Sequence, residues 1–287
     1  MREYASLGGI DRDAPAFRLY TKAKALGTWD PAAIDLSRDA EDWVRLSGDE
    51  RDLLLRVTSL FQAGEESVVV DLVPLLLVIG REGRVEEELF LAAWLWEEAK
   101  HTELFRRFLD EVAGAPAGLE RFHSPSYERL FAHELPASMS ALLEDPSPAA
   151  QARAVATYTM IVEGVLAETG YHGYFSALER EGLLPGLREG LALTKRDESR
   201  HIAYGVHLLS RLVHEDPSLW DVVDTRMQEL FPLAHGLVEE SFAPYDPVPF
   251  GLVPGDFLAY AMEQFQKRYA RIERARIGGS AGLDPDD

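Results

Sequence analysis

The stretches Glu98-Ala-Lys-His101 and Glu198-Ser-Arg-His201 are two copies of a Glu-x-x-His pattern that lie one hundred residues apart. A lone glutamate precedes each copy: Glu65 is 33 residues before Glu98, and Glu163 is 35 residues before Glu198. One glutamate from each of two helices, with a Glu-x-x-His pair from each of two others, can surround two metal ions inside a four-helix bundle. The sequence therefore predicts that these six residues bind a dinuclear metal centre, one that activates oxygen.

Helical patterns cover most of the chain, and no convincing alternating strand is present. Ser47-Gly-Asp-Glu50 is a capping box, and Ser147-Pro148 offers a helix cap followed by proline in the first turn. Ligand spacings of 33 to 35 residues suit long antiparallel helices joined by short loops. We expect helices over about 47–80 (bent near Pro74), 85–112, 126–143, 147–181, 186–213, 219–243 and 256–277.

This pattern predicts an all-α fold, a ferritin-like four-helix bundle with additional flanking helices. No linker rich in glycine, serine or proline divides the chain, so we expect one domain over residues 1–287. Its helical core spans about 47–277. The segment 1–46 is expected to pack on the bundle, and 278–287 to form a disordered tail.

The composition excludes several classes of protein. The chain has no cysteine, so disulfides, zinc–thiolate sites and iron–sulfur clusters are ruled out. Its formal net charge of −20 argues against nucleic acid and anionic membranes as partners. The first residues lack the apolar core of a signal peptide, and the longest apolar run, 72–80, is too short to span a bilayer. We expect a cytoplasmic protein without an integral membrane segment.

Glutamates that lie next to each other must be told apart. Glu65 shares a helical face with Phe61 and Val68, whereas Glu66 lines up with Ser59 and Gln62 on a face expected to be wetter. Glu65 is therefore the predicted ligand.

On the second helix, Glu98 preserves the spacing that recurs at Glu198 and His201, and is preferred over Glu97. On the third helix, Glu163 lies among apolar residues and is preferred over Glu168. A third Glu-x-x-His copy, Glu120-Arg-Phe-His123, falls in a short segment between prolines and is expected to lie at the surface.

The residue types favour two cations over scattered salt bridges. Buried carboxylates cost several kcal/mol each unless they are paired, so four of them converging on an apolar core require positive charge. Two divalent ions neutralise four glutamates. Carboxylate oxygens and imidazoles without thiolate suit iron or manganese. Asp197, directly before Glu198, is a candidate to accept the second N–H of a ligating histidine.

The chain resembles the small subunits of ribonucleotide reductase. The resemblance begins at Trp29-Asp-Pro-Ala-Ala-Ile-Asp-Leu-Ser-Arg-Asp and continues through Leu46-Ser-Gly-Asp-Glu-Arg-Asp and the six ligands to about residue 270. It implies a hydrogen-bonded chain of Trp29, Asp197 and His101. The radical-bearing tyrosine of those subunits would fall at Phe105, which argues against a standard tyrosyl-radical subunit.

A closer resemblance is to the ligand-binding oxidases that are similar to these small subunits. It rests on Phe61-Gln-Ala-Gly-Glu-Glu-Ser-Val68, Trp96-Glu-Glu-Ala-Lys-His101-Thr, Tyr158-Thr-Met-Ile-Val-Glu163-Gly and Glu168-Thr-Gly-Tyr171. The resemblance implies a homodimer, a mixed manganese/iron centre (with di-iron as the alternative) that reacts with O2, and a long-chain fatty acid or similar hydrophobic ligand at the metals.

The same resemblance implies an ether cross-link between a valine and a tyrosine, formed when the centre reacts with oxygen. The matching residues are Val68 and Tyr158. Val68 shares a face with Glu65, but Tyr158 is five residues before Glu163, about 140° away on an ideal helix. A π-bulge in the third helix would help to pair them.

Three other functions remain open. The first is a non-radical reductase small subunit with a manganese/iron centre, although the C-terminal tail has no aromatic residue after Tyr269 for docking to a large subunit. The second is an acyl-carrier-protein desaturase, which would act on an acyl-protein. The third is ferritin-like iron storage, which requires a large hollow assembly and is excluded if the protein is a dimer.

Overall fold

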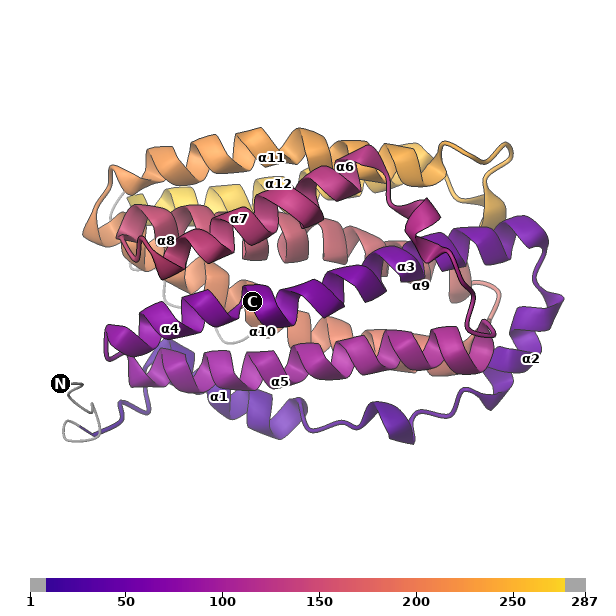
Figure 1. Cartoon of the computed structure of the whole chain (residues 1–287), viewed down its shortest axis with the longest axis horizontal. Coiled ribbons are helices and arrows are strands. Elements are labelled where there is room, and N and C mark those ends of the chain that lie inside the picture. The colour runs from indigo at the N-terminus through magenta and orange to yellow at the C-terminus, as the bar shows by residue number, and fades with distance from the viewer. Residues whose placement is uncertain (1–8, 277–287) are drawn as a thin grey trace.

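The computed structural model describes residues 9–276, and within that range every regular element is a helix. Six long rods run through it: α3, α5, the continuous rod formed by α8, η7 and α9, α10, α11 and α12 (Figure 1). The bounds are α1 Pro15–Leu26, η2 Pro31–Ala33, α2 Ser37–Arg45, α3 Gly48–Asp71, α4 Val73–Arg81, α5 Val85–Arg107, η3 Phe108–Val112, η4 Leu119–Phe122, α6 Pro125–Tyr127, η5 Glu128–Glu134, α7 Leu135–Ser140, η6 Ala141–Leu143, α8 Pro148–Val155, η7 Ala156–Ala167, α9 Glu168–Leu178, α10 Pro185–Glu215, α11 Leu219–Phe242, η8 Pro249–Gly251 and α12 Pro254–Arg276.

Four rods form the bundle that carries the predicted ligands. Helix α3 packs against α5, and η7 packs against α10. Because α5 and α10 also contact each other, the four rods form one bundle. Each rod contributes from its middle, so the ligands meet inside the bundle rather than at its ends. The predicted all-α four-helix bundle is confirmed.

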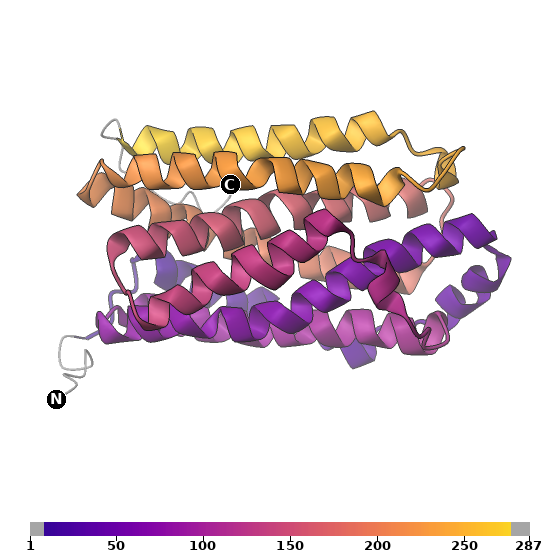
Figure 2. The same cartoon turned by 45° about the horizontal axis from the view of Figure 1, so that its top comes forward.

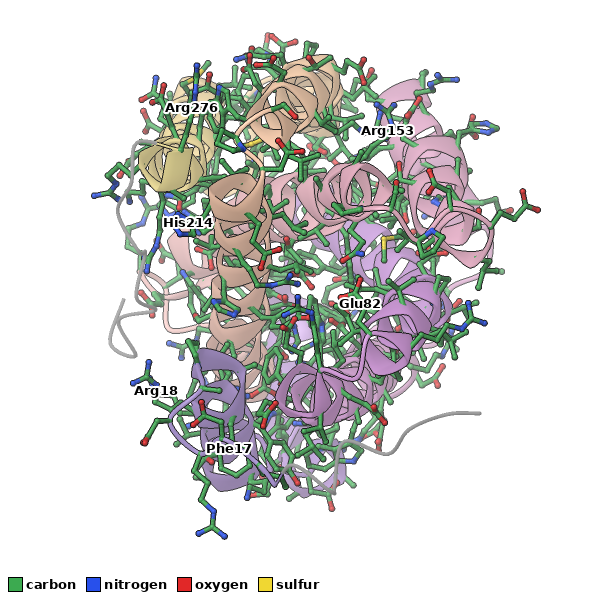
Figure 3. The ribbon with its side chains drawn as sticks, turned by 90° about the vertical axis from the view of Figure 1, so that its left-hand side faces the viewer. Phe17, Arg18, Glu82, Arg153, His214 and Arg276 are labelled. Atoms are coloured by element: carbon green, nitrogen blue, oxygen red, sulfur yellow. The ribbon has the colours of Figure 1, made fainter. Side chains whose placement is uncertain are left out.

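Further helices cover this bundle on two sides. Helices α11 and α12 pack against η7 on one side, and α12 also packs against α10 (Figure 2). On the other side, α1 lies against α5 and α10, and α2 contacts α10. Viewed along the bundle, the labelled charged residues Arg18, Arg153 and Arg276 lie at the periphery (Figure 3).

The predicted helix starts are confirmed by their caps. Ser47 and Glu50 make both hydrogen bonds of a capping box, and the Ser147 side chain accepts from the Ala150 N–H. The predicted bend near Pro74 is present as the break between α3 and α4. The helices α1 and α2 were not predicted, and the predicted tail 278–287 lies outside the described residues.

The third rod changes its hydrogen bonding at the site. Over Ala156–Ala167 it is π-helical, and the Glu168 N–H donates to the Glu163 carbonyl five residues earlier. Bonding from i to i+5 widens the turn, so that residues five apart lie closer to one face. Tyr158 and Glu163 are such a pair, and both are buried.

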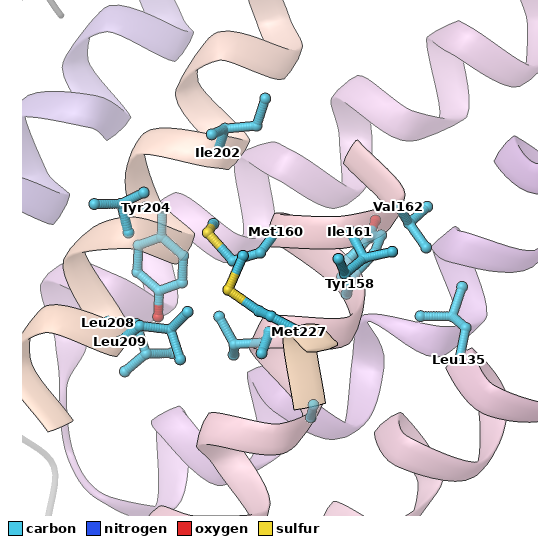
Figure 4. Packing of buried hydrophobic residues seen from close by; sticks show 14 of the residues in the cluster. Leu135, Tyr158, Met160, Ile161, Val162, Ile202, Tyr204, Leu208, Leu209 and Met227 are labelled. Carbon is cyan, nitrogen blue, oxygen red and sulfur yellow. The ribbon is translucent and has the colours of Figure 1, made fainter. Parts of the chain in front are cut away.

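The buried apolar residues form two clusters beside the predicted site, one with Trp94 and Tyr158 and the other with Phe105 and Tyr171. Figure 4 shows part of the first cluster, with Tyr158, Met160, Ile161 and Val162 of η7 among residues of α7, α10 and α11. Within residues 9–276, none of the helices combines the length and the apolar character needed to cross a membrane.

Candidate metal centre

The structure brings all six predicted ligands together as two groups. One group is Glu65, Glu98, His101 and Glu198; the other is Glu98, Glu163, Glu198 and His201. Within each group the candidate ligand atoms lie within 4.8 Å of one another, and every residue is buried. Glu98 and Glu198 belong to both groups, so two bound ions would share these glutamates.

Distances inside the groups suit metal ligands. His101 Nδ1 lies 3.4 Å from Glu98 Oε2 and 3.5 Å from Glu198 Oε1. His201 Nδ1 lies 3.3 Å from Glu98 Oε1 and 3.3 Å from Glu198 Oε2. An ion with octahedral bonds of about 2.1 Å separates neighbouring ligand atoms by about 3 Å. Both histidines therefore turn Nδ1 toward the shared glutamates. A small hard cation would need to shorten these nitrogen–oxygen distances only slightly.

Several ligand atoms have no protein partner of their own. Among the described residues, Glu98 Oε2, both carboxylate oxygens of Glu163 and His101 Nδ1 are buried without a hydrogen bond. Buried polar atoms are normally satisfied, and an unsatisfied group calls for an explanation such as an ion. Their convergence at one point fits a metal site.

The electrostatics of the cluster also call for cations. Burial, followed by the neighbouring Glu98 carboxylate, raises the pKa of Glu65 well above its usual value. Burial and Glu198 do the same to the pKa of Glu163. Burial acts in the same direction on Glu98, but the adjacent imidazoles of His101 and His201 outweigh it and hold its pKa well below the usual range. Divalent ions would replace the protons that otherwise relieve this crowding.

The outer nitrogen of each histidine faces a carboxylate from the other Glu-x-x-His helix. His101 Nε2 lies 3.4 Å from Asp197 Oδ2, and the Trp29 indole donates to the same oxygen at 2.7 Å. Asp197 Oδ2 thus lies between the Trp29 indole and His101. His201 Nε2 lies 2.9 Å from Glu97 Oε2. Such outer partners fix the orientation of ligating histidines.

Glu97 is the residue that sequence reasoning missed. It was weighed only as a competing ligand, yet it is fully buried behind His201. Arg200 joins the two outer acids, since its Nη2 donates at 2.5 Å to Glu97 and at 2.5 Å to Asp197. The signal was present: both motifs read acid, glutamate, any residue, cation, histidine, and Lys100 holds Asp197 at 3.0 Å as the counterpart of Arg200.

The residues that competed with the ligands lie elsewhere. Glu66 is exposed, as predicted, but Ser59 and Gln62 are buried, so their face is not the wetter one. Buried Gln62 donates to the Glu66 carboxylate at 2.7 Å. Glu66 therefore lies at the surface, at the edge of a face that is otherwise buried.

Glu168 faces outward to Tyr260 and Lys195, away from both ligand groups. His123 is half-buried, with its ring 4.5 Å from that of Tyr127. It belongs to neither of the two groups that the described residues form.

An apolar cavity opens onto the ligands. Its walls enclose about 930 Å³ of space not filled by atoms, part of it open to solvent. Carboxylates of four predicted ligands face it at one end: Glu65, Glu98, Glu163 and Glu198. Leu53, Val57, Phe61, Leu166, Leu237, Phe242 and Phe257 are among the residues that line the rest.

Comparisons with known proteins agree with this site. Residues 12–246 match the family "Ribonucleotide reductase, small chain". Solved structures of R2-like ligand-binding oxidase variants are similar over nearly the whole chain. A tyrosine-to-phenylalanine variant with aerobically reconstituted Mn/Fe cofactor is 36% identical, over 96% of this chain and 99% of that chain, with a TM-score of 0.90. A valine-to-isoleucine variant, also aerobically reconstituted, is 35% identical over 96% and 100%, with a TM-score of 0.92.

A helical bundle that holds two carboxylate–histidine groups with shared glutamates is typical of the dinuclear carboxylate proteins. The chain belongs to the ribonucleotide reductase small-chain family and, within it, to the R2-like ligand-binding oxidases.

Removal of the Glu97 carboxylate should weaken metal binding without removing a ligand. In Glu97→Ala the Nε2–H of His201 loses its acceptor, and loss of such a partner typically lowers metal affinity by about 10- to 100-fold. Competition with a chelating dye measures this affinity. Glu103→Ala, an exposed glutamate on the same helix, is the matched control. Equal affinity in the two variants would contradict the role of Glu97.

Proposed function

We propose that the protein is a dinuclear manganese/iron oxidase that activates O2. Glu65, Glu98, His101 and Glu198 would hold one ion, and Glu98, Glu163, Glu198 and His201 the other. The observation that carries the proposal is this pair of buried groups, which share two carboxylates and face an apolar cavity. When bound, the metals would supply the redox chemistry that reduces O2. Related oxidase structures are described with Mn/Fe cofactor, which supports this choice of metals over di-iron.

The chain's own residues shape where that chemistry acts. Asp197 and Glu97 orient the two histidines, and Trp94 donates its indole N–H to Glu98 Oε1 at 2.6 Å. Apolar walls on the open side of the centre lower the local polarity, which strengthens charge interactions there. The protein side of the site is therefore preorganised.

The ligand in the cavity is proposed to be a long-chain fatty acid or a similar hydrophobic molecule. Small-molecule pockets are lined mostly by apolar side chains with few polar groups, and the lining of this cavity fits that description. Its only acidic groups among the described lining residues are the metal ligands. A carboxylate head would bind at the metals, while its chain lies along Phe61, Leu166 and Phe242.

Val68 and Tyr158 are proposed to become joined by an ether bond. Both line the cavity beside the ligands, and the Tyr158 hydroxyl donates to Glu98 Oε1 at 3.3 Å. The related structures include variants of a glycine, of a valine four residues later and of a tyrosine ninety residues after that. Gly64, Val68 and Tyr158 have the same spacing, which supports the match.

A homodimer is also proposed. Val70, Val73 and Leu77 form an exposed apolar strip along α3 and α4, which a second copy of the chain could cover. Sedimentation analysis would show twice the chain mass, and a monomer at all concentrations would exclude the dimer. An assembly of many chains would instead favour iron storage.

One second function has a specific observation in its favour. The chain of Trp29, Asp197 and His101 is the arrangement that reductase small subunits use, and it favours a non-radical small subunit. Ribonucleotide reduction in the presence of a reductase large subunit would establish that function. Phe105, stacked 5.0 Å from Phe61 where those subunits have a tyrosine, argues for the oxidase.

The metal content tests the proposal directly. Metal-free protein given Mn(II) and Fe(II) without oxygen should bind one of each per chain, because the ligand set is hard and holds two divalent ions at neutral charge. Air should then change the optical spectrum, and a mass spectrum of denatured protein should show a co-purified fatty acid. Uptake of two zinc ions, with no optical change on exposing any iron-loaded form to air, would sink the proposal.

A further inference from the structure

Two buried aromatic rings lead from the metal ligands toward the edge of the bundle. The Trp94 ring is stacked on His201 with 4.5 Å between ring centroids, and its indole N–H donates to Glu98 at 2.6 Å. The Tyr204 ring meets Trp94 edge-on at 6.0 Å. Both rings are fully buried. Tyr204 thus contacts Trp94, and Trp94 contacts two predicted ligands, His201 and Glu98.

Phe90 completes a closed aromatic cluster around this contact. Its ring lies 6.0 Å from Trp94 and 5.3 Å from Tyr204. Figure 4 shows Tyr204 within the apolar cluster that also holds Met160, Leu208 and Met227. Water is therefore kept from both rings, and a radical formed there would be shielded from side reactions.

The outer end of the pair carries a proton acceptor. The Tyr204 hydroxyl donates to Glu87 Oε2 at 2.8 Å. Glu87 also faces Arg84 at 3.4 Å and Arg211 at 3.8 Å, and the Arg84 side chain is 33% exposed. The carboxylate thus connects a fully buried phenol to a charged group at the surface.

This arrangement suits the loss of an electron from the phenol. Burial, followed by Glu87, raises the pKa of Tyr204 well above its usual value, so the phenol is neutral at physiological pH. An oxidised phenol is a strong acid, and its oxidation is easiest when the proton leaves at the same time. Glu87 is already within hydrogen-bond distance to take it. No step of the proposed ether formation uses either residue.

We propose that Trp94 and Tyr204 form an electron-transfer route, called the outlet because it relieves the centre of one oxidising equivalent. The route would deliver one electron to the metal centre when O2 has oxidised it and no substrate reacts. The inference rests on the proposed function. Tyr204 would give up one electron through Trp94, and an oxidised metal centre held by the predicted ligands would accept it. The phenolic proton passes to Glu87, and Tyr204 becomes a neutral phenoxyl radical. A soluble one-electron reductant such as ascorbate then restores the phenol as Glu87 returns the proton.

The outlet would lead to the ion held by the group of His201, whereas Trp29 lies next to the group of His101. Trp29 reaches His101 through Asp197, whereas Trp94 lies directly against His201. Each histidine therefore has its own aromatic route, and the two can be separated by substitution.

Peptide mapping after oxygen exposure tests the outlet. Full-length protein loaded with Mn(II) and Fe(II) is exposed to air without added reductant, then digested with trypsin. Residues 85–100 form one peptide that holds Trp94 and the half-exposed Trp96. In Tyr204→Phe the electron vacancy should stay on Trp94, so peptide carrying added oxygen at Trp94 should rise about fivefold or more over wild type. Oxidation at Trp96 gives the background in the same peptide.

Two variants and a spectrum complete the test. Glu87→Gln should raise Trp94 oxidation as well, because the phenol loses its proton acceptor. Tyr269→Phe removes a tyrosine that donates to Asp224 far from the site, and should match wild type. Freeze-quenched wild type should show a tyrosyl radical signal that is lost in Tyr204→Phe. If wild type and the three variants all react with air and show equal Trp94 oxidation, the outlet is overturned and the proposed function stands. A wild type that binds the metals but does not react with air would overturn the proposed function, and the outlet with it.

Discussion

Alanine in place of Glu198 should leave the protein unable to retain at least one of its two metal ions. Glu198 belongs to both ligand groups, so the substitution removes an oxygen from each. It also leaves three glutamates to balance two divalent ions, and a buried excess charge costs several kcal/mol. His101→Ala should strip the ion of the first group. Metal per chain, measured after anaerobic loading and desalting, gives the result.

Controls separate loss of ligation from loss of fold. Glu168→Ala removes another buried glutamate, five residues after Glu163, that belongs to neither group. His123→Ala removes the histidine of the third Glu-x-x-His copy. Both should retain two ions per chain, with helical content like that of wild type. If Glu198→Ala also retained two ions with unchanged spectra, the ligand assignment would fail.

Most of the bundle was predictable because its signals are local. Ser47 and Ser147 mark helix starts with side chains that cap the backbone, and ligands recur at helical spacing. The helices α1 and α2 lack such marks: Ala14 and Leu36 at their N-caps make no side-chain cap. They are positioned by packing against α5 and α10, which sequence patterns of a single segment do not reveal.

The π-helical turn of η7 could only be suggested. Every residue of Ala156–Leu166 is buried. The segment therefore has no polar face from which a change from α-helical to π-helical spacing could be read. The resemblance requires Tyr158 and Val68 to meet, and the wider turn brings Tyr158 nearer to the face of η7 that carries Glu163. Close packing supports the turn, since Gly205 of α10 leaves no room for a Cβ beside Thr159. Contacts of this kind depend on the assembled bundle.

The ligands and one supporting acid, Asp197, could be named from the sequence, whereas the roles of Glu97 and Arg200 were missed, for one physical reason. Ligands repeat by type and spacing along each helix, whereas Glu97 and Arg200 act across helices. Glu97 serves the histidine of α10, and Arg200 joins it to Asp197. The N-terminal segment adds Trp29 and the Gly27 carbonyl, which accepts from Lys100 at 2.6 Å. Only the fold shows that Glu97 stands behind His201.

Metal loading followed by oxygen should join Val68 covalently to Tyr158. The new bond links the Val68 β-carbon to the Tyr158 phenolic oxygen. One hydrogen leaves each residue, and the two electrons and two protons go to O2 reduced at the centre. Burial, followed by the Glu98 carboxylate, raises the pKa of Tyr158 well above its usual value, so the phenol enters the reaction protonated and donating to Glu98. Both residues line the cavity wall beside Glu65.

Trypsin makes this cross-link easy to see. Val68 falls in the peptide 57–81 and Tyr158 in the peptide 154–180, so wild type should give one branched peptide that is two hydrogens lighter than its separate halves. Protein kept anaerobic and Tyr158→Phe should give only linear peptides. Tyr171→Phe is the matched control, because Tyr171 also donates to a predicted ligand, Glu198, at 3.3 Å but is not among the residues that line the cavity. It should keep the branched peptide. Full recovery of both linear peptides from oxygen-treated wild type would favour the non-radical reductase subunit instead, since that function needs the metals and Trp29 but no bond between α3 and η7.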